Sequence, residues 1–559
     1  MELTVFPEKA QFGAAEEIAV QAELRGCPEK GRRVRLTLCH LGEKDAVQEK
    51  DAAPELRFVF RPKEETAFLQ GFWVEAKLLD GKKTLACAYT ACDRAASWKY
   101  APRYGFLSDF ERAERDDEQD VREMNRLHLN IVQFYDWMYR HDDFFPPEDE
   151  FGEFQDVMGR RLSMETVRRK IDLLHRRGMK AFAYGAVYGA EDYAKAHPAC
   201  ALYNDRREPI RFIDRITLMD IHRTCAWHRR ILGEYRKAVR FGFDGIHMDQ
   251  YGFPKEAWGL ENGKFALRRL RDDFPALIDD ARAALPESGI LFNAVNDWPV
   301  DAAARSAQDC VYVEVWSPND TYRDLNRLIA DAKKYAPSKQ VILAAYLRPY
   351  GEQAGADPRG CTARLAMATI FSSGGFHLLL GEDGGVLTEA YYPRYHRLSS
   401  PEAAEAFRCY YDFITAYEEL LFDPALIDET RTSAGGINTE CRFWGASFSV
   451  EAEPGRVWTQ VKRGREYRVI HLVNFTGIDR MNWNEPHPSL PGFVRGITVE
   501  VKVPEETEEV VLASPDLDHG GSRPLAFTRS VGDDGNAVLR FTIPELRVWD
   551  MIFIRTKAV

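Results

Sequence analysis

Two acidic residues lie at the ends of segments that are typical of buried β-strands. Asp249 ends the apolar run in residues 242–252 (GFDGIHMDQYG), and Glu314 lies near the end of the run in 309–318 (DCVYVEVWSP). If both strands belong to one parallel barrel, their carboxyl ends meet at the rim where such barrels carry catalytic residues. A pair of carboxyl groups there has the chemistry of glycoside hydrolysis, in which one acid attacks and the other donates a proton.

A single acid at a strand end has a simpler explanation, because Asp often caps the helix that follows. Two acids with aromatic neighbours, Tyr251 beside one and Trp316 beside the other, favour the catalytic interpretation. Asp244 lies five residues before Asp249, and we expect it to belong to the start of the strand rather than to the site.

Eight short apolar segments alternate with helix-length amphipathic stretches in the middle of the chain. The segments span residues 103–110, 130–137, 179–188, 243–249, 289–296, 310–316, 340–346 and 375–382. One of the intervening stretches, 264–285, has the length of a single helix. This alternation predicts βα units around a parallel sheet, and eight such units close a (β/α)8 barrel.

The two ends of the chain have a different pattern of apolar and polar residues. Alternating runs such as 33–41 (RVRLTLCHL) and 468–475 (RVIHLVNF) are separated by charged or glycine-containing turns, which predicts antiparallel sandwiches. We therefore predict an α/β fold in which a catalytic (β/α)8 barrel (98–425) is flanked by two β-sandwiches. The N-terminal sandwich (1–97) is expected to be immunoglobulin-like, and the C-terminal one (426–559) antiparallel.

Composition excludes several classes of partner. The 559 residues carry a net charge of −12, which argues against a nucleic-acid partner. No segment approaches the roughly 18 uncharged apolar residues of a membrane span. The ten cysteines contain no CxxC pair, and the N-terminus lacks a signal-peptide pattern. We therefore expect a cytoplasmic protein, with a secreted protein that has lost its leader as the alternative.

The predicted strand ends are rich in aromatic, amide and acidic side chains. Amides and carboxylates bind the hydroxyl groups of sugars, and Tyr and Trp stack on their apolar faces, so we expect an oligosaccharide or polysaccharide substrate. The candidate substrate-binding residues are Tyr135, Asp136, His141, Tyr184, Tyr251, Asn293, Trp316, Tyr346, His377 and Glu382.

Other chemistries have little support in the sequence. The chain has no HExxH motif and no Cys/His cluster, and we expect His247 to face away from Asp249, so no metal site is predicted. It has neither a GxSxG elbow nor a GxGxxG or GxxxxGK[ST] loop, so neither a serine mechanism nor a nucleotide cofactor is expected.

Five longer motifs point to a known family. They are QFYDWMYRHDDFFP (133–146), GFDGIHMDQYG (242–252), FNAVN (292–296), YVEVWSPNDTY (312–322) and HLLLGEDGGVLTEAYYP (377–393). In these motifs and in its layout the chain resembles glycoside hydrolase family 66, the dextranases and cycloisomaltooligosaccharide glucanotransferases. The resemblance implies a retaining enzyme specific for α-1,6-glucosidic bonds, with Asp249 as nucleophile and Glu314 as acid/base. It also implies that Tyr135, Asp136 and His141 line the sugar subsites nearest the cleaved bond.

We therefore expect a retaining glycoside hydrolase that acts on dextran or isomaltooligosaccharides without a cofactor. The first alternative is a transglycosylase that forms linear or cyclic isomaltooligosaccharides by the same chemistry. The second is a non-catalytic carbohydrate-binding protein, which needs the stacking residues but neither acid. No oligomeric state is predicted.

Overall fold

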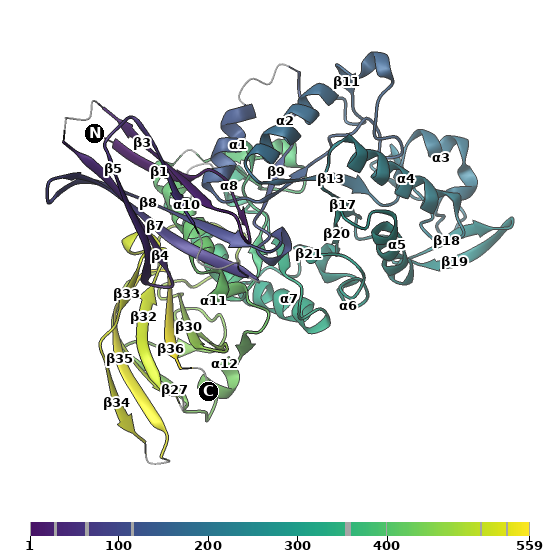
Figure 1. Cartoon of the computed structure of the whole chain (residues 1–559). Helices are drawn as coiled ribbons and strands as arrows, with labels where there is room; N and C mark the ends of the chain where they lie inside the picture. Colours follow the sequence, from purple (N-terminus) through teal and green to yellow (C-terminus); the bar gives the residue numbers. More distant parts are fainter. Residues whose placement is uncertain are drawn as a thin grey trace.

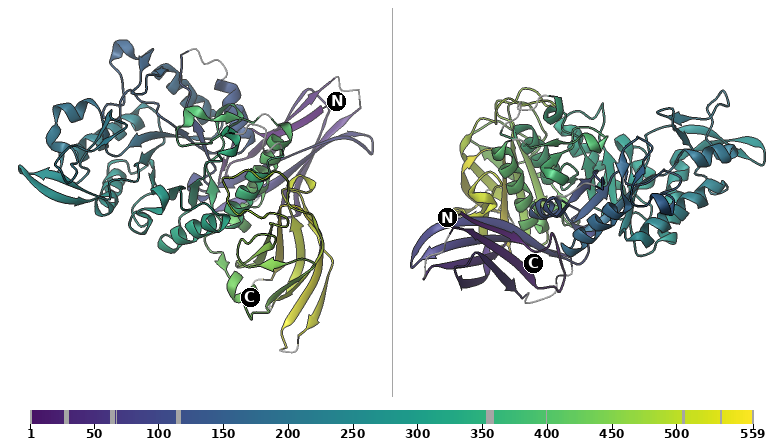
Figure 2. Two further views of the ribbon diagram at one scale, coloured as in Figure 1. Left: turned by 180° about the vertical axis from the view of Figure 1, so that it is seen from behind. Right: turned by 90° about the horizontal axis from the view of Figure 1, so that it is seen from above.

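The computed structural model describes residues 2–26, 31–61, 66, 68–112, 117–352, 359–398, 400–503, 506–532 and 535–557. Its centre is a barrel, with one β-sandwich built from the first part of the chain and another from the last part (Figure 1). Both sandwiches lie on the same side of the barrel, and the hairpin of β18 (Glu256–Glu261) and β19 (Lys264–Arg269) projects from the opposite side (Figure 2).

The barrel contains eight parallel strands that coincide with the eight predicted segments. In chain order they are β9 (Tyr104–Leu107), β10 (Ile131–Phe134), β13 (Lys180–Ala186), β17 (Gly245–Asp249), β20 (Gly289–Asn293), β21 (Cys310–Glu314), β22 (Val341–Ala344) and β23 (Phe376–His377). Each strand pairs with the next one in this order. A parallel bridge between Phe106 and Gly381 brings the end of the series back to β9, so the barrel is nearly closed. The predicted fold class is confirmed.

The barrel strands are mostly apolar, with polar residues concentrated near their carboxyl ends, because both of their faces are buried. Every residue of β9, β10, β20 and β22 is buried, as expected for strands between a packed interior and a ring of helices. Gly245 and Gly289 admit the Phe182 ring into the barrel interior. A Cβ atom at Gly289 would lie 2.2 Å from that ring and one at Gly245 2.6 Å from it, so no side chain fits at either position.

Helices follow most of the strands and cover the outside of the barrel. They include α1 (Asp117–Arg126), α2 (Met164–Arg176), α4 (Ala226–Phe241), α5 (Leu270–Ala284), α7 (Tyr322–Tyr335), α9 (Cys361–Ser372), α10 (Pro401–Ala416) and α11 (Glu418–Phe422). Capping residues set two of the helix starts: Ser163 accepts from the backbone N–H of Thr166 in α2, and Thr321 forms a capping box with Asp324 in α7.

One predicted helix is shorter than expected. The stretch 264–285 was interpreted as one helix, but its first six residues form β19 and α5 begins only at Leu270. The turn at Asn262 and Gly263, both of which have positive φ, folds β18 back onto β19. Pairing with β18 therefore overrides the local helix preference of these residues.

The N-terminal sandwich contains two sheets. One has β1 (Glu2–Pro7), β3 (Ile18–Arg25) and β6 (Glu55–Phe60), and the other has β2 (Phe12–Gly13), β8 (Lys83–Ala95), β7 (Leu69–Asp80), β4 (Arg33–His40) and β5 (Glu43–Asp51). The fully buried Val20, Val34, Phe58 and Val74 fill the space between them.

The C-terminal sandwich also contains two sheets. The larger has β26 (Ile427–Asp428), β29 (Val457–Arg463), β30 (Tyr467–Asn474), β36 (Trp549–Thr556), β32 (Thr507–Ala513) and β33 (Ser522–Pro524), with β28 (Phe448–Ser449) beside β29. The smaller has β27 (Cys441–Trp444), β31 (Val494–Lys502), β35 (Ala537–Leu546) and β34 (Phe527–Val531). β8 ends at Ala95 and β26 begins at Ile427, while the domain boundaries at 97/98 and 425/426 stay predictions.

None of the described helices combines the length and the apolar composition that a membrane crossing requires. Nine cysteines lie among the described residues, and all nine are free thiols.

A buried arginine joins the barrel to the segments on both of its sides. Arg103, directly before β9, is 2% exposed. It donates to the Asp93 carboxylate of β8 at 2.8 Å and to the Glu418 carboxylate of α11 at 3.1 Å. It also donates to the backbone oxygens of His128 at 2.6 Å and Ala10 at 3.1 Å. Removing the guanidinium would leave two buried carboxyl groups without their cation.

We expect Arg103→Met to lower the free energy of unfolding by about 3–5 kcal/mol, the usual cost of breaking a buried ion pair from one side. Arg25→Met is the matched control, because its side chain is 77% exposed and lies 3.9 Å from Glu2. That control should cost less than about 1 kcal/mol. Urea unfolding of the three proteins measures both values, and equal effects of the two substitutions would contradict the role of Arg103.

Candidate active site

A cavity of about 540 Å³ lies at the carboxyl-terminal end of the barrel. Residues in or after strands β10 to β23 line it, as expected for a barrel of this type. Ten of the twelve predicted site residues take part in the lining: Tyr135, Asp136, His141, Tyr184, Asp249, Tyr251, Asn293, Glu314, Trp316 and Tyr346.

One amide joins the two acids. Asp249, Asn293 and Glu314 are the last residues of β17, β20 and β21, three strands that are neighbours in the sheet. The Asn293 Nδ2 atom donates to Asp249 Oδ1 at 2.7 Å and to Glu314 Oε2 at 3.1 Å. Tyrosine hydroxyls bind the remaining oxygens: Tyr184 donates to Asp249 Oδ2 at 2.8 Å, and Tyr346 donates to Glu314 Oε1 at 2.8 Å. The carboxyl groups are thereby fixed relative to each other.

The two acids share a poorly solvated environment. Burial, followed by the charge of Glu314, raises the pKa of Asp249 to about 7. Burial also raises the pKa of Glu314. The hydrogen bonds from Asn293 and the tyrosines act in the opposite direction because they stabilise the charged forms. Since two like charges this close repel, the pair is expected to hold one proton near neutral pH.

His141 brings a positive charge to the cavity. Its Nδ1 atom lies 2.6 Å from Glu191 Oε1, and its backbone N–H donates to Glu191 Oε2 at 3.0 Å. Burial alone would lower the pKa of His141, but the charges of Glu191 and Asp136 and the hydrogen bond to Glu191 raise it to about 9. Asp142 holds the loop by accepting the backbone N–H groups of Glu191 and Tyr193. His141 is therefore an imidazolium at neutral pH.

Asp136 is held in a left-handed backbone conformation, with a φ of 47°. The Arg160 guanidinium donates to the backbone oxygen of Asp136 at 2.7 Å and lies 3.9 Å from its carboxylate. Burial raises the pKa of Asp136, and the Arg160 charge opposes this shift. The strained turn directs a carboxyl group into the cavity beside His141.

Aromatic rings form the walls. Tyr135 stacks on Tyr392 with a ring separation of 4.3 Å, and Tyr251 stacks on Phe212 with a separation of 4.1 Å. Trp316, which is 43% exposed, meets Tyr346 edge-on at 6.0 Å. These flat surfaces suit the apolar faces of sugar rings.

Two of the predicted site residues do not line the cavity. Glu382 is 1% exposed and accepts the backbone N–H and hydroxyl of Ser108, with Lys170 Nζ at 3.5 Å. His377 is also 1% exposed, and its Nε2 atom lies 2.8 Å from the backbone oxygen of Ala345. His377 lies within the last predicted strand segment and Glu382 ends it, and protein groups already bind both Glu382 carboxylate oxygens and the Nε2 atom of His377. The interpretation from strand ends alone was therefore wrong about their position.

The structure also adds residues that the sequence analysis did not select. Tyr391 and Tyr392, within the last quoted motif, line the cavity, and so do Tyr312 and His247. We expected His247 to face away from Asp249, and this expectation was wrong because residues two apart in a strand share a face. Burial lowers the pKa of His247 to about 3, so it is a neutral ring in the cavity floor.

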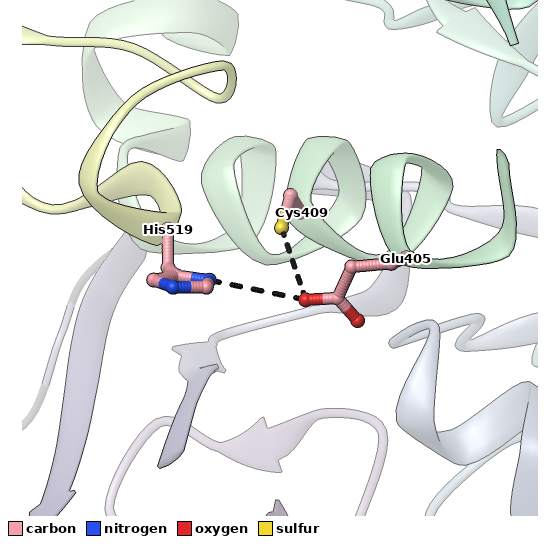
Figure 3. A group of neighbouring side chains, drawn as sticks. All are labelled: Glu405, Cys409 and His519. Carbon is pink, nitrogen blue, oxygen red and sulfur yellow. Dashed lines mark hydrogen bonds and ion pairs between the residues drawn. The ribbon is translucent and has the colours of Figure 1, made fainter. Parts of the chain in front are cut away.

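The described residues contain one group of three potential metal ligands, Glu405, Cys409 and His519 (Figure 3). None of them lines the cavity. Arg408 already binds the Glu405 carboxylate through two nitrogen atoms, and burial raises the pKa of the Cys409 thiol to about 12. A neutral thiol and a paired carboxylate are poor ligands, so the group has no role in the site described above.

A (β/α)8 barrel with two bridged carboxyl groups between aromatic walls at its rim has the design of an enzyme that acts on glycosidic bonds. The sequence matches glycosyl hydrolase family 66 over residues 7–553, and the chain belongs to that family. The family inferred from the five motifs is thus confirmed.

Relatives with named activities are distant. A cycloisomaltooligosaccharide glucanotransferase of Niallia circulans is 25% identical over 624 residues, which cover 84% of this chain and 63% of the relative. A dextranase of Streptococcus salivarius is 24% identical over 533 residues, which cover 82% of this chain and 64% of the dextranase. The matches therefore span less than two thirds of either relative.

A solved structure shares the fold over nearly the whole chain. It is the crystal structure of a cycloisomaltooligosaccharide glucanotransferase from Paenibacillus sp. complexed with cycloisomaltoheptaose, with a TM-score of 0.87 and 22% identity. The superposition covers 99% of this chain and 100% of that one. It supports the barrel with two sandwiches as the architecture of this protein.

We expect Glu191→Gln to lower the pKa of His141 from about 9 toward its ordinary value of about 6.5, since the Glu191 charge is lost while burial and the Asp136 charge still act in opposite directions. In the parent protein, the ion pair contributes stability fully below pH 6.5 and loses it as the pH rises through about 9. The variant should lack this loss.

NMR titration of the imidazole signals measures the pKa, and thermal unfolding between pH 6 and 10 measures the stability. The His247 signal, whose pKa burial holds at about 3, serves as an internal control. A His141 pKa that does not change in the variant would contradict the ion pair.

Proposed function

We propose that this protein is a retaining glycoside hydrolase that cleaves α-1,6-glucosidic bonds of dextran or isomaltooligosaccharides. Asp249 is the nucleophile, and Glu314 is the acid/base. The observation that carries the proposal is the bridge through Asn293. Two oxygens bonded to one nitrogen at 2.7 and 3.1 Å lie no more than about 5.8 Å apart. Retaining enzymes hold their carboxyl groups about 5–5.5 Å apart, whereas inverting enzymes need about 6.5–9.5 Å.

The mechanism follows from the roles of the two acids. In the first step, the Asp249 carboxylate attacks the anomeric carbon while Glu314 donates its proton to the departing glycosidic oxygen. The bond to the leaving sugar breaks, and a covalent glycosyl ester on Asp249 forms. In the second step, Glu314 removes a proton from an incoming hydroxyl, whose oxygen attacks the same carbon and releases Asp249. Two inversions give net retention.

The neighbouring residues supply the conditions for both steps. The single proton of the pair has to be on Glu314 before the first step. A tyrosine and Asn293 bind each of the two carboxyl groups, so these hydrogen bonds fix the positions of both acids. Positive charge that develops at the anomeric carbon favours the anion of Asp249, which lies next to that carbon. Asp136 and the His141 imidazolium, which line the cavity together, are placed to bind hydroxyl groups of the glucosyl unit.

The substrate assignment rests on the relatives. The similar proteins from Streptococcus salivarius and Niallia circulans are named dextranase and cycloisomaltooligosaccharide glucanotransferase. The structurally similar protein was crystallised with cycloisomaltoheptaose. We extend the shared substrate class, an α-1,6-linked glucan, to this chain.

A transglycosylase is the second candidate, and the glucanotransferase relatives favour it. It differs only in the hydroxyl that enters the second step, which is water for hydrolysis and a sugar for transfer. A non-catalytic binding protein is the weaker alternative, because stacking rings alone would serve it and the bridged acids would have no use.

We expect Asp249→Asn and Glu314→Gln each to reduce turnover of isomaltooligosaccharides by about 10²-fold or more, the usual contribution of a nucleophile or a general acid. The two variants should differ on a nitrophenyl glycoside, whose leaving group needs no proton. Glu314→Gln should still release nitrophenol in the first step, and Asp249→Asn should not.

Asp244→Asn is the matched control, because Asp244 directly precedes β17, the strand of Asp249, and binds His175 and Lys180 outside the cavity. Steady-state and burst kinetics of the four proteins provide the measurement. If the Asp249 or the Glu314 variant kept more than about a tenth of the parent rate on isomaltooligosaccharides, that residue would not have the proposed role.

We expect activity on dextran and isomaltooligosaccharides and little on maltooligosaccharides or cellulose. Chromatography of the digests separates the alternatives: short linear products indicate hydrolysis, and rings or longer chains indicate transfer. Comparable rates on maltooligosaccharides would contradict the linkage specificity. Unchanged substrates in every digest would support the non-catalytic alternative.

A further inference from the structure

A second cavity adjoins the first one. Its volume is about 330 Å³, and Trp316 and Tyr346 line both cavities. On the barrel side it is lined by residues that follow β21, β22 and β23, and on the other side by residues 482–485 of the C-terminal domain. The rings of Trp316 and Tyr346 thus form a wall that the two cavities share.

The position of this wall relates the second cavity to the acid/base. The Tyr346 hydroxyl that binds Glu314 belongs to the shared wall, and Trp316 lies two residues after Glu314 on the same strand end. Tyr184, which binds Asp249, lines only the first cavity. Because the acid/base protonates the departing oxygen, the leaving sugar lies on its side of the site. The second cavity is therefore on the leaving-group side.

The segment that contains residues 482–485 is firmly attached to the barrel. It lies in the connection between β30 and β31, residues 475–493. The Trp483 indole donates to the backbone oxygen of Asn319 at 2.8 Å, and the Tyr322 hydroxyl lies 2.9 Å from His487 Nε2. The Cys361 thiol donates to the backbone oxygen of Ser489 at 3.0 Å. These contacts with α7, α9 and the loop before α7 give the connection a defined position over the barrel rim.

The polar groups in the second cavity suit a neutral sugar. Within the described part of the chain, the side chains of Arg348, Asn482 and Asn484 form no hydrogen bond or ion pair, although all three line the cavity. Asp320, Glu389 and Glu485 also line the cavity, and arginines outside it pair with Glu389 and Glu485. The lining has no surplus of positive charge for a phosphorylated sugar, whereas the hydroxyl groups of an uncharged glucan match amide and guanidinium donors.

We propose that the second cavity is a leaving-group-side sugar subsite, built jointly by the barrel and the 475–493 connection of the C-terminal domain. It binds the glucosyl units beyond the cleaved bond of an isomaltooligosaccharide, and the acceptor sugar when the reaction is a transfer. Trp316 supplies the stacking surface, and Arg348 and Asn484 bind hydroxyl groups. This inference rests on the proposed function, since it assigns the leaving-group side from the role of Glu314.

The test compares two substrates that differ only on the leaving-group side. Isomaltohexaose places sugars in the second cavity, whereas a nitrophenyl isomaltooligosaccharide places only the aromatic leaving group there. Asn484→Ala and Arg348→Ala should each lower kcat/KM for isomaltohexaose about three- to tenfold, the effect of one lost hydrogen bond. The value for the nitrophenyl substrate should not change. With isomaltose added as acceptor, the yield of transfer product should fall in parallel.

Asp479→Ala is the control, because Asp479 is exposed in the same connection and lies outside both cavities. It should leave both substrates unaffected. Circular dichroism verifies folding, and Arg348→Lys provides a milder variant that should retain part of the lost activity. Equal losses on the two substrates, or no loss on isomaltohexaose in either alanine variant, would overturn the subsite while leaving the proposed function intact. A parent protein that cleaves neither substrate would overturn both.

Discussion

The hydrogen bonds of the Asn293 amide are the constraint on which the catalytic arrangement depends. They require that β17, β20 and β21 be neighbours and keep the observed register, in which Met248 is paired with Phe292 and Asn293 with Tyr312. A shift of one residue would turn one of the three side chains toward the helices. The glycines that receive the Phe182 ring and the surrounding helices hold this register, so the packing of the barrel interior sets the spacing of the two acids.

The aromatic walls have two consequences at the same place. They offer flat surfaces for sugar rings, and they keep water away from the carboxyl groups, which raises the pKa of both acids. The raised pKa that a proton donor needs near neutral pH is therefore produced by the same walls that bind the substrate. His141 shows the reverse case, because the Glu191 carboxylate keeps its charge in a buried position. Burial and pairing together determine which groups in the cavity are charged.

The sequence alone was sufficient for the eight barrel strands and for the two acids, because each acid ends an apolar run whose position in a barrel is known. Strand ends were a weaker guide to the other residues. Glu382 follows β23 and His377 ends it, but Glu382 binds Ser108 and His377 binds the Ala345 backbone, contacts that depend on the folded barrel. Tyr391 and Tyr392 line the cavity from further along the loop that follows the last strand. The residues 482–485 come from another domain, and no local pattern relates them to the rim. Residues 264–269 form the strand β19 instead of the predicted helix because they pair with β18.

The Arg103 network has a consequence for the order in which the chain is completed on the ribosome. Arg103 and Glu418 are 315 residues apart. At a synthesis rate of about 5–20 residues per second, Glu418 is added roughly 15–60 s after Arg103. During that interval the N-terminal sandwich can fold and supply Asp93, but β9 still lacks its neighbour across the barrel, which Gly381 provides. The nascent barrel therefore exposes unpaired strand edges for much of its synthesis. Such edges are binding sites for chaperones and starting points for aggregation.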